Sequence, residues 1–188
     1  RSPLSTQAIF SYLVTTQQLQ ISACFLLVRR QILFDHDIFF PSGMISEDIF
    51  WNFHLWQHLT SVKFTNLNLY GYYHRGGSIT TSPNIRYYHS YDQIFTFWKE
   101  QCDIGCKNAE AIRSFFANMW VSRGYDYFFL NGNEKSEALR ILKKHSYLLN
   151  YGISPKSKRV QRMAKLIGVR ATVVALGLYW QLRSFLKH

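Results

Sequence analysis

The sequence has little charge and little cysteine for its length. Charged residues make up 18% of its 188 residues, whereas soluble domains usually carry about 25%. Its three cysteines are an odd and sparse set, which argues against a disulfide scaffold and favours a reducing compartment. Cys102 and Cys106 could share one helical face, but two thiols without further ligands make a poor zinc site.

Several kinds of segment are also missing from the sequence. We find no internal repeat, no low-complexity run and no Gly-rich phosphate loop. The uncharged stretch at residues 171–182 is too short for a membrane span, which needs about twenty apolar residues. The chain starts at Arg1 with neither Met nor a signal-like segment, so we expect it to be part of a longer protein.

Aromatic residues and positive charge, by contrast, are plentiful. Aromatics make up 17% of the chain, so we expect some of them to face a ligand or a membrane. The net charge is +11, and all of the excess lies in residues 138–188, which contain no acidic residue. A basic segment of this kind favours an anionic partner, either nucleic acid or an anionic lipid surface.

The hydrophobic pattern predicts both helices and strands. We expect helices at residues 6–14, across most of 90–130 and at 134–149, where apolar residues recur at helical spacing. The apolar run at 21–30 suits a buried strand or the start of a helix, and alternation over 61–80 predicts one or two strands.

Two neighbouring acids, Glu47 and Asp48, begin an aromatic helix that we expect to end near residue 59 or 60. Ser46 is a favoured N-cap residue, and the first turn of a helix favours negative charge. Ile45 and Phe50 could form a hydrophobic staple across that first turn. Capping alone is one explanation of the acidic pair, and a chemical role is the other.

A wider set of residues around the pair supports the chemical role. The set comprises Phe40, Gly43, Glu47, Asp48, Phe50, Tyr70, Tyr72, Tyr73, Arg75, Ser78 and Ile79. In this order and spacing, residues 21–80 resemble the C-terminal half of the family 2 glycosyltransferases, which have the GT-A fold. The resemblance implies an α/β fold, with a partial Rossmann-like half on the acceptor side followed by a mainly helical C-terminal region.

The resemblance also implies a mechanism. Asp48 would be the general base that takes the proton from the acceptor hydroxyl, with Glu47 beside it in the active-site wall. Such enzymes are usually inverting and commonly use a divalent cation, Mg or Mn, to stabilise the leaving diphosphate. We expect their Asp-x-Asp metal ligands to be absent from this chain, because we interpret Asp35 and Asp37 as turn residues. We therefore expect this chain to be inactive alone.

Further contacts can be carried over from the resemblance. Arg75, Ser78 and Trp51 are the candidates for substrate binding, and His74 is a candidate metal ligand. The alternatives are that His74 and Arg75 end a strand in solvent and that Trp51 packs in the core. His54 and the histidine four residues later lack the glutamate of a zinc hydrolase motif.

The basic C-terminal tail predicts an interfacial anchor. Its charges precede the uncharged stretch at 171–182, in the order Lys156, Lys158, Arg159, Arg162, Lys165 and Arg170. A basic helix followed by an apolar one with Tyr179 and Trp180 is typical of a segment lying on anionic lipid. Nucleic acid is less favoured because the aromatics follow the charges instead of alternating with them. Alternatively, the tail simply packs on the body of the protein.

Together these observations predict three regions and one leading function. The regions are the glycosyltransferase half at 1–85, a helical region at 86–153 and a membrane-associating tail at 154–188. The function would be transfer of a sugar from a nucleotide sugar to a glycan or lipid-linked acceptor, at the cytoplasmic face of the inner membrane. The alternative is a non-catalytic helical module that binds anionic membrane or nucleic acid through the tail.

Overall fold

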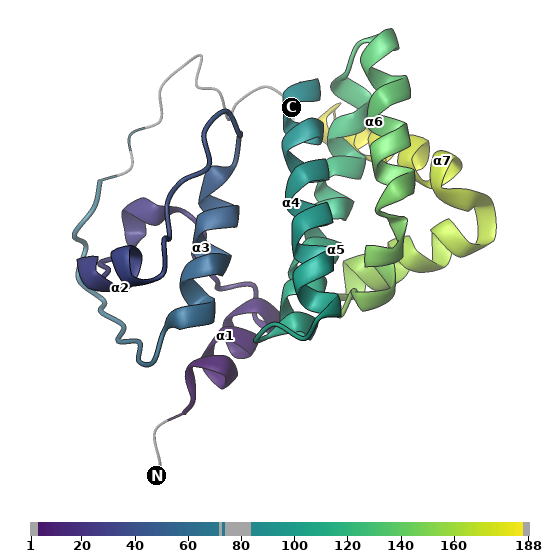
Figure 1. Cartoon of the computed structure of the whole chain (residues 1–188). Helices are drawn as coiled ribbons and strands as arrows, with labels where there is room; N and C mark the ends of the chain where they lie inside the picture. The colour runs from purple at the N-terminus through teal and green to yellow at the C-terminus, as the bar shows by residue number, and fades with distance from the viewer. Residues whose placement is uncertain (1–3, 72, 74–83, 186–188) are drawn as a thin grey trace.

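The fold was analysed in a computed structural model, which describes residues 4–71, 73 and 84–185. These residues form only helical elements joined by irregular segments (Figure 1). In chain order they are α1 (Thr6–Thr15), η1 (Ala23–Phe25), α2 (Arg30–Asp35), α3 (Glu47–His58), α4 (Ile85–Asp103), α5 (Ala109–Asp126), η3 (Tyr127–Phe129), α6 (Gly132–Lys144), η4 (Ser146–Tyr151) and α7 (Pro155–Phe185).

The prediction of an α/β fold with a Rossmann-like half is wrong. No strand occurs among the described residues, and the architecture is all-α. The apolar run at 21–30 forms a short 3-10 turn and irregular chain, with α2 starting at Arg30. Residues 61–71 alternate as a strand would, but they form no strand ladder with any described segment, and Phe64 is 68% exposed. A strand needs a neighbour to receive its backbone hydrogen bonds, and alternation alone does not provide one.

The helix predictions are confirmed. The helix expected at 6–14 is α1, and the acidic helix is α3, which ends at His58. The region 90–130 contains α4 and α5, separated by a turn in which Gly105 has a φ of 91°. The helix expected at 134–149 is α6, followed by the 3-10 helix η4.

Phe53 of α3 joins the first helices to the rest of the core. Its side chain is fully buried. Its ring centroid lies 5.7 Å from that of Phe10 on α1, 5.7 Å from Trp98 on α4 and 5.3 Å from Phe116 on α5. Edge-to-face and tilted ring pairs at such distances add to the stabilisation from burial. One cluster of buried side chains therefore runs from α1 through α3 to α4 and α5.

Helix α7 closely approaches α5 and the following 3-10 helix η3 at two glycines. A Cβ atom on Gly124 of α5 would lie 2.8 Å from Leu176 Cδ1. A Cβ atom on Gly177 of α7 would lie 2.7 Å from the Cβ of Phe128. At both positions any side chain larger than hydrogen would require neighbouring atoms to move. Helix α7 is therefore closely packed against α5 and η3.

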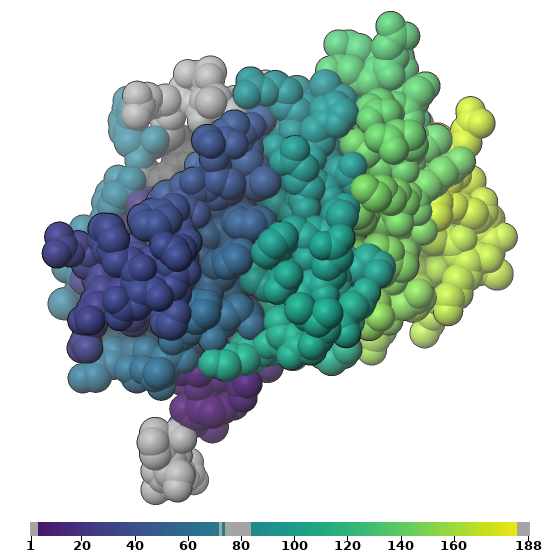
Figure 2. Space-filling model, in the orientation of Figure 1, coloured from purple at the N-terminus to yellow at the C-terminus, as the bar shows by residue number. Residues whose placement is uncertain are grey.

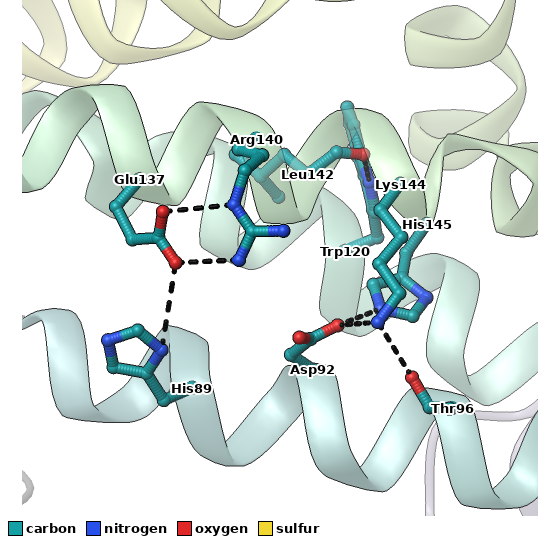
Figure 3. A network of polar contacts seen from close by, with 9 residues as sticks. All are labelled: His89, Asp92, Thr96, Trp120, Glu137, Arg140, Leu142, Lys144 and His145. Atoms are coloured by element: carbon teal, nitrogen blue, oxygen red, sulfur yellow. Dashed lines mark hydrogen bonds and ion pairs between the residues drawn. The ribbon is translucent and has the colours of Figure 1, made fainter.

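A network of polar contacts joins α4 to α6 and its C-terminal end (Figure 3). Asp92 Oδ1 accepts hydrogen bonds from Lys144 Nζ at 2.7 Å and from His145 Nε2 at 2.6 Å. Lys144 also donates to Thr96 Oγ1 at 3.1 Å. Nearby, Glu137 accepts two bonds from the guanidinium of Arg140 at 2.7 and 3.0 Å.

His145 is the buried member of this network, with 2% exposure. Burial lowers the pKa of His145 more than its hydrogen bond to Asp92 raises it. Burial also raises the pKa of Asp92, but the bonds from Lys144 and His145 outweigh this, so the net pKa is lowered. Nδ1 of His145 is buried and has no hydrogen-bond partner in the described chain. A neutral ring with its proton on Nε2 satisfies these surroundings best.

Replacing Phe53 by Ala should destabilise the protein by about 3–5 kcal/mol, because it removes a fully buried ring and leaves a cavity. Chemical denaturation followed by circular dichroism measures the change in the free energy of unfolding. Phe64→Ala is the matched control, since that ring is exposed, and its effect should stay within about 0.5 kcal/mol. If both variants lowered the free energy of unfolding equally, Phe53 would not have the central packing role that we assign to it.

The protein should lose stability as the pH falls from 7 to 5.5, partly through His145. The pKa of His145 is lower in the folded state than in the unfolded state, where it has the ordinary value of 6.5. Protonation of His145 therefore favours unfolding. The stability that the neutral His145 ring contributes is therefore complete at pH values above the unfolded-state pKa. It declines below that pKa, by at most about 1.4 kcal/mol per pH unit for one proton.

Denaturation of the wild type and of His145→Gln at a series of pH values checks this expectation. Gln keeps an N–H donor for Asp92 but does not titrate, so its stability should fall less steeply. His54 and His58, whose pKa values burial also lowers, remain in both proteins and cancel in the comparison. Parallel pH profiles would show that His145 is not responsible.

Candidate functional site

The acidic pair lies where the sequence predicts it, in the first turn of α3. Glu47 and Asp48 are both partly exposed. Among the described residues, neither carboxylate has an ion pair or a side-chain hydrogen bond. The free N–H groups of the first helical turn favour the ionised form of a carboxylate placed there. Asp48 is thus a solvent-accessible carboxylate without a structural partner in this part of the chain.

Ser46 occupies the N-cap position of α3, but it does not cap the helix with its side chain. Its backbone is left-handed, with a φ of 64°, and its hydroxyl makes no bond to the first turn. Instead, Ser46 Oγ lies 3.2 Å from the hydroxyl of Tyr91 on α4. The prediction of a side-chain cap is therefore wrong, because a group 45 residues away competes for the hydroxyl.

A second bond fastens the loop before α3 to α4. The backbone N–H of Ile45 donates to Ser90 Oγ at 2.9 Å. With the contact between Ser46 and Tyr91, this bond fixes the position at which α3 begins. The direction of the acidic pair is therefore set by the N-terminal half of α4 as well as by α3 itself.

An aromatic and cationic cluster lies beneath this loop. The guanidinium of Arg123 on α5 lies 5.0 Å from the ring centroid of Tyr91 and 5.8 Å from that of Tyr87. Burial raises the pKa of Tyr87, with smaller contributions from Tyr91 and, among others, from Glu47. The acidic pair is thus electrostatically linked to this cluster through Glu47.

Asp126 completes the cluster on α5. Its carboxylate lies 2.8 Å from Arg123 Nη2, and burial raises its pKa although Arg123 lowers it. Arg123 Nε is buried without a hydrogen-bond partner in the described chain. The cluster therefore holds a cation close to the loop that precedes the acidic pair.

A hollow of about 200 Å³ lies beside the same loop. Its lining residues are Gly43, Ile45, Arg86, His89, Ser90 and Gln93. Neither carboxylate of the acidic pair lines it, although Ile45 is only two residues from Glu47. Its size suits a small polar group, and its polar side chains come from one face of α4.

The structure buries Trp51, which the resemblance suggested as a wall for the sugar. Its side chain is 5% exposed and stacks on Phe40, with ring centroids 5.0 Å apart. Trp51 belongs to a small cluster with Ile38 and Leu55, between α2 and α3. This arrangement corresponds to the core alternative for Trp51 and leaves it little surface for a ligand.

The other predicted site residues are not placed. His74, Arg75 and Ser78 lie outside the described residues. Of the predicted site residues that the structure describes, Glu47 and Asp48 are therefore partly exposed side by side, and Trp51 is buried.

The described residues do not fit a divalent-cation site. No group of three or more His, Cys, Asp or Glu side chains that could hold a metal ion occurs among them. Asp37 has a φ of 51°, as expected of an aspartate in a turn. Sγ of Cys106 lies 3.7 Å from Sγ of Cys102, and burial raises the pKa of the Cys102 thiol to about 12. A thiol of this kind is protonated at neutral pH and does not bind metal readily.

Sequence reasoning missed the residues that position the acidic pair. Tyr87 and Tyr91 are four residues apart, so their spacing indicates a shared helical face. The sequence contains no signal that would bring this face to Ser46, or Arg123 to the same place. Those contacts depend on how α3, α4 and α5 pack.

The chain was compared with known proteins by sequence and by structure. Comparison with family models, with curated proteins and with solved structures gave no significant match.

Proposed function

We propose that this chain forms the acceptor side of an inverting glycosyltransferase and that Asp48 is its general base. The observation that carries the proposal is the state of the Asp48 carboxylate. It is partly exposed at the start of α3 and has no ion pair in the described chain. A general base must be open to the acceptor, and a partly exposed carboxylate without an ion pair meets that requirement.

In the proposed reaction, an acceptor hydroxyl of a glycan or lipid-linked sugar lies within hydrogen-bond reach of Asp48. As its oxygen attacks the anomeric carbon, its proton passes to the carboxylate. The bond between that carbon and the nucleoside diphosphate breaks, and the diphosphate leaves with the electron pair. Attack from the opposite side inverts the configuration at the anomeric carbon.

Two features of the fold support this role for Asp48. The position of α3 is fixed by the bonds from its preceding loop to Ser90 and Tyr91, which makes the direction of the carboxylate reproducible. The helix dipole favours the ionised carboxylate that a base requires at neutral pH. Glu47 would add negative charge to the same wall of the site.

The proposal needs a donor site made by other residues. The described residues contain no sheet that would hold a nucleotide and no group that fits a divalent cation. We therefore assign no step to a metal. Arg75, Ser78 and His74 stay predicted contacts of the donor.

The all-α architecture also favours a second candidate, a non-catalytic helical module. In that case the acidic pair would serve only to stabilise the start of α3. The two candidates differ in what replacing Asp48 should do, because a first-turn charge contributes only about 0.3–1 kcal/mol to stability.

Asp48→Asn should abolish sugar transfer while the protein stays folded. We would place the change in the gene of the source organism, so that every other part of the enzyme is present. Transfer from radiolabelled nucleotide sugars in membranes of those cells should fall at least about 100-fold, since a general base contributes about 10²–10⁴-fold. Mass spectrometry of the glycans should show the loss of the corresponding product.

Asp37→Asn is the matched control, because it removes the same charge at a turn position where Asn is well tolerated. Its transfer rate should equal that of the wild type. If deleting the gene changes the glycans but Asp48→Asn does not, the assignment of the base is wrong. If deletion leaves all glycans and transfer rates unchanged, the chain is not a glycosyltransferase and the non-catalytic module is favoured.

A further inference from the structure

We propose that the bend and outer face of α7 dock onto an anionic phospholipid bilayer. This inference does not depend on the glycosyltransferase proposal, since it uses none of the residues around α3. It begins from the shape of α7, which turns back on itself at the edge of the molecule (Figure 1). Gly168, with a φ of 78° and a ψ of 162°, separates an arm at 155–167 from an arm at 169–185.

The open ends of the two arms meet at Tyr125 on α5. Lys156 Nζ of the first arm lies 4.3 Å from the ring centroid of Tyr125. Trp180 of the second arm lies 5.7 Å from the same ring, centroid to centroid. Burial, and then repulsion from the nearby charge of Arg183, lowers the pKa of Lys156, which agrees with the two ends lying close together. Helix α7 is therefore a hairpin whose bend points away from Tyr125.

Each arm buries one face against the body of the protein. The first arm buries Ser157 and Val160, and the second buries Thr172, Val173 and Leu176. The Thr172 hydroxyl donates to the carbonyl oxygen of Gly168 at 2.8 Å, which stabilises the start of the second arm. The opposite faces of both arms are left in solvent along one edge of the molecule (Figure 2).

The bend is the most exposed apolar part of α7. Leu166 is 83% exposed and Ile167 is 53% exposed, directly before Gly168. The nearest charged residues are Lys165 and Arg170, and both are exposed. Two aliphatic side chains between two cations suit an interface where apolar groups enter the acyl layer and cations meet the headgroups.

The outer face of the second arm continues this apolar surface. Its exposed aliphatic residues recur at steps of four, so they form one stripe along the helix: Val174, Leu178 and Leu182. Tyr179 and Trp180 lie beside the stripe and are about half exposed. Such aromatic rings are favoured at the level of the lipid headgroups.

The first arm supplies uncompensated positive charge. Lys158, Arg159 and Arg162 are exposed. Together with Lys165 and Arg170, they form no ion pair with any residue in the described part of the chain. No acidic residue occurs anywhere in 138–188. The exposed face of α7 is thus both cationic and aliphatic, which matches an anionic bilayer in charge and in polarity.

The hairpin fits a helix lying on the membrane better than one crossing it. By length and composition, residues Pro155–Arg183 could cross a membrane, but the core helix of a soluble protein can meet the same criteria. However, the bend interrupts the helix, and the uncharged stretch at 171–182 spans only about 18 Å against a hydrocarbon core of about 30 Å. The second arm is also packed on α5 and η3 through Leu176 and Gly177.

Nucleic acid is the less suitable partner for this surface. Binding to single strands uses exposed aromatic rings that stack with bases between cations. Here the side chains at the bend are aliphatic, and Tyr179 and Trp180 lie against Tyr125 at one end of the hairpin. Docking on lipid would make the chain a peripheral membrane protein, as the sequence predicted.

Co-sedimentation with vesicles tests the proposal. The wild-type chain should bind vesicles of phosphatidylcholine with 30% phosphatidylserine and should bind pure phosphatidylcholine at least about tenfold more weakly. Binding should also weaken as the NaCl concentration rises, because screening removes the headgroup attraction. Equal binding to both vesicle types, or no binding to either, would overturn the proposal.

Variants at the bend and a matched control locate the surface. The double variant Leu166→Glu with Ile167→Glu should weaken vesicle binding at least about 100-fold. The double variant Lys165→Gln with Arg170→Gln should weaken it about 25-fold, since each cation contributes about fivefold. Leu27→Glu is the control, because Leu27 is 93% exposed and lies in another part of the chain. The control should bind like the wild type, and circular dichroism should show that all variants are folded.

Two results would show that another surface or partner is used. If the bend variants bind as tightly as the wild type, α7 is not the docking surface. If the wild type binds single-stranded RNA or DNA in a gel-shift assay but does not bind the anionic vesicles, nucleic acid is the partner of the tail. The glycan measurements on Asp48→Asn are independent, so failure of either proposal can be distinguished from failure of the other.

Discussion

The structure depends on α5 being covered on most of its sides. Ile112, Phe116 and Trp120 on this helix are almost fully buried, and the indole N–H of Trp120 donates to the carbonyl oxygen of Leu142 at 2.9 Å. Helices α1, α4 and α7 and the 3-10 helix η4 all contact α5. Glu110 is the one exposed residue of α5, so this helix lies inside and the other helices cover it.

This arrangement links the two surfaces to which we assign functions. Arg123 on α5 lies over the tyrosines of α4, and those residues hold the loop that starts α3 and its carboxylates. Two residues further along α5, Tyr125 contacts both ends of the α7 hairpin. The acidic site and the basic surface are therefore built on neighbouring residues of the same helix, although they are far apart in the sequence.

The sequence could predict the helices, because helix formation depends on contacts within a few residues. The spacing of Ile49, Phe53 and Trp56 is sufficient to place α3, and its start at Glu47 follows from the acidic first turn. The strand prediction at 61–80 failed in the described part because pairing depends on a neighbour that no local pattern specifies. The resemblance to a GT-A enzyme led to an α/β expectation that the described residues do not meet.

The candidate site could be predicted only in part, for the same physical reason. The position of Asp48 at a helix start follows from the sequence, and its solvent exposure had to come from the fold. The loss of the Ser46 cap could not be predicted, because it results from the hydroxyl of Tyr91, which tertiary packing brings within 3.2 Å. The burial of Trp51 against Phe40 was one of two alternatives, and packing between α2 and α3 selected it.

The absence of two methyl groups governs how the outside of α7 is oriented. At positions 124 and 177 a hydrogen atom stands where any other residue would carry carbon, and this lets α7 lie close against α5 and η3. A bulkier group at position 177 would have to displace Phe128 or the second arm, and a displaced arm would move the row that includes Leu178 with it. The orientation of the exposed side chains on α7 thus depends on two crowded contacts in the interior.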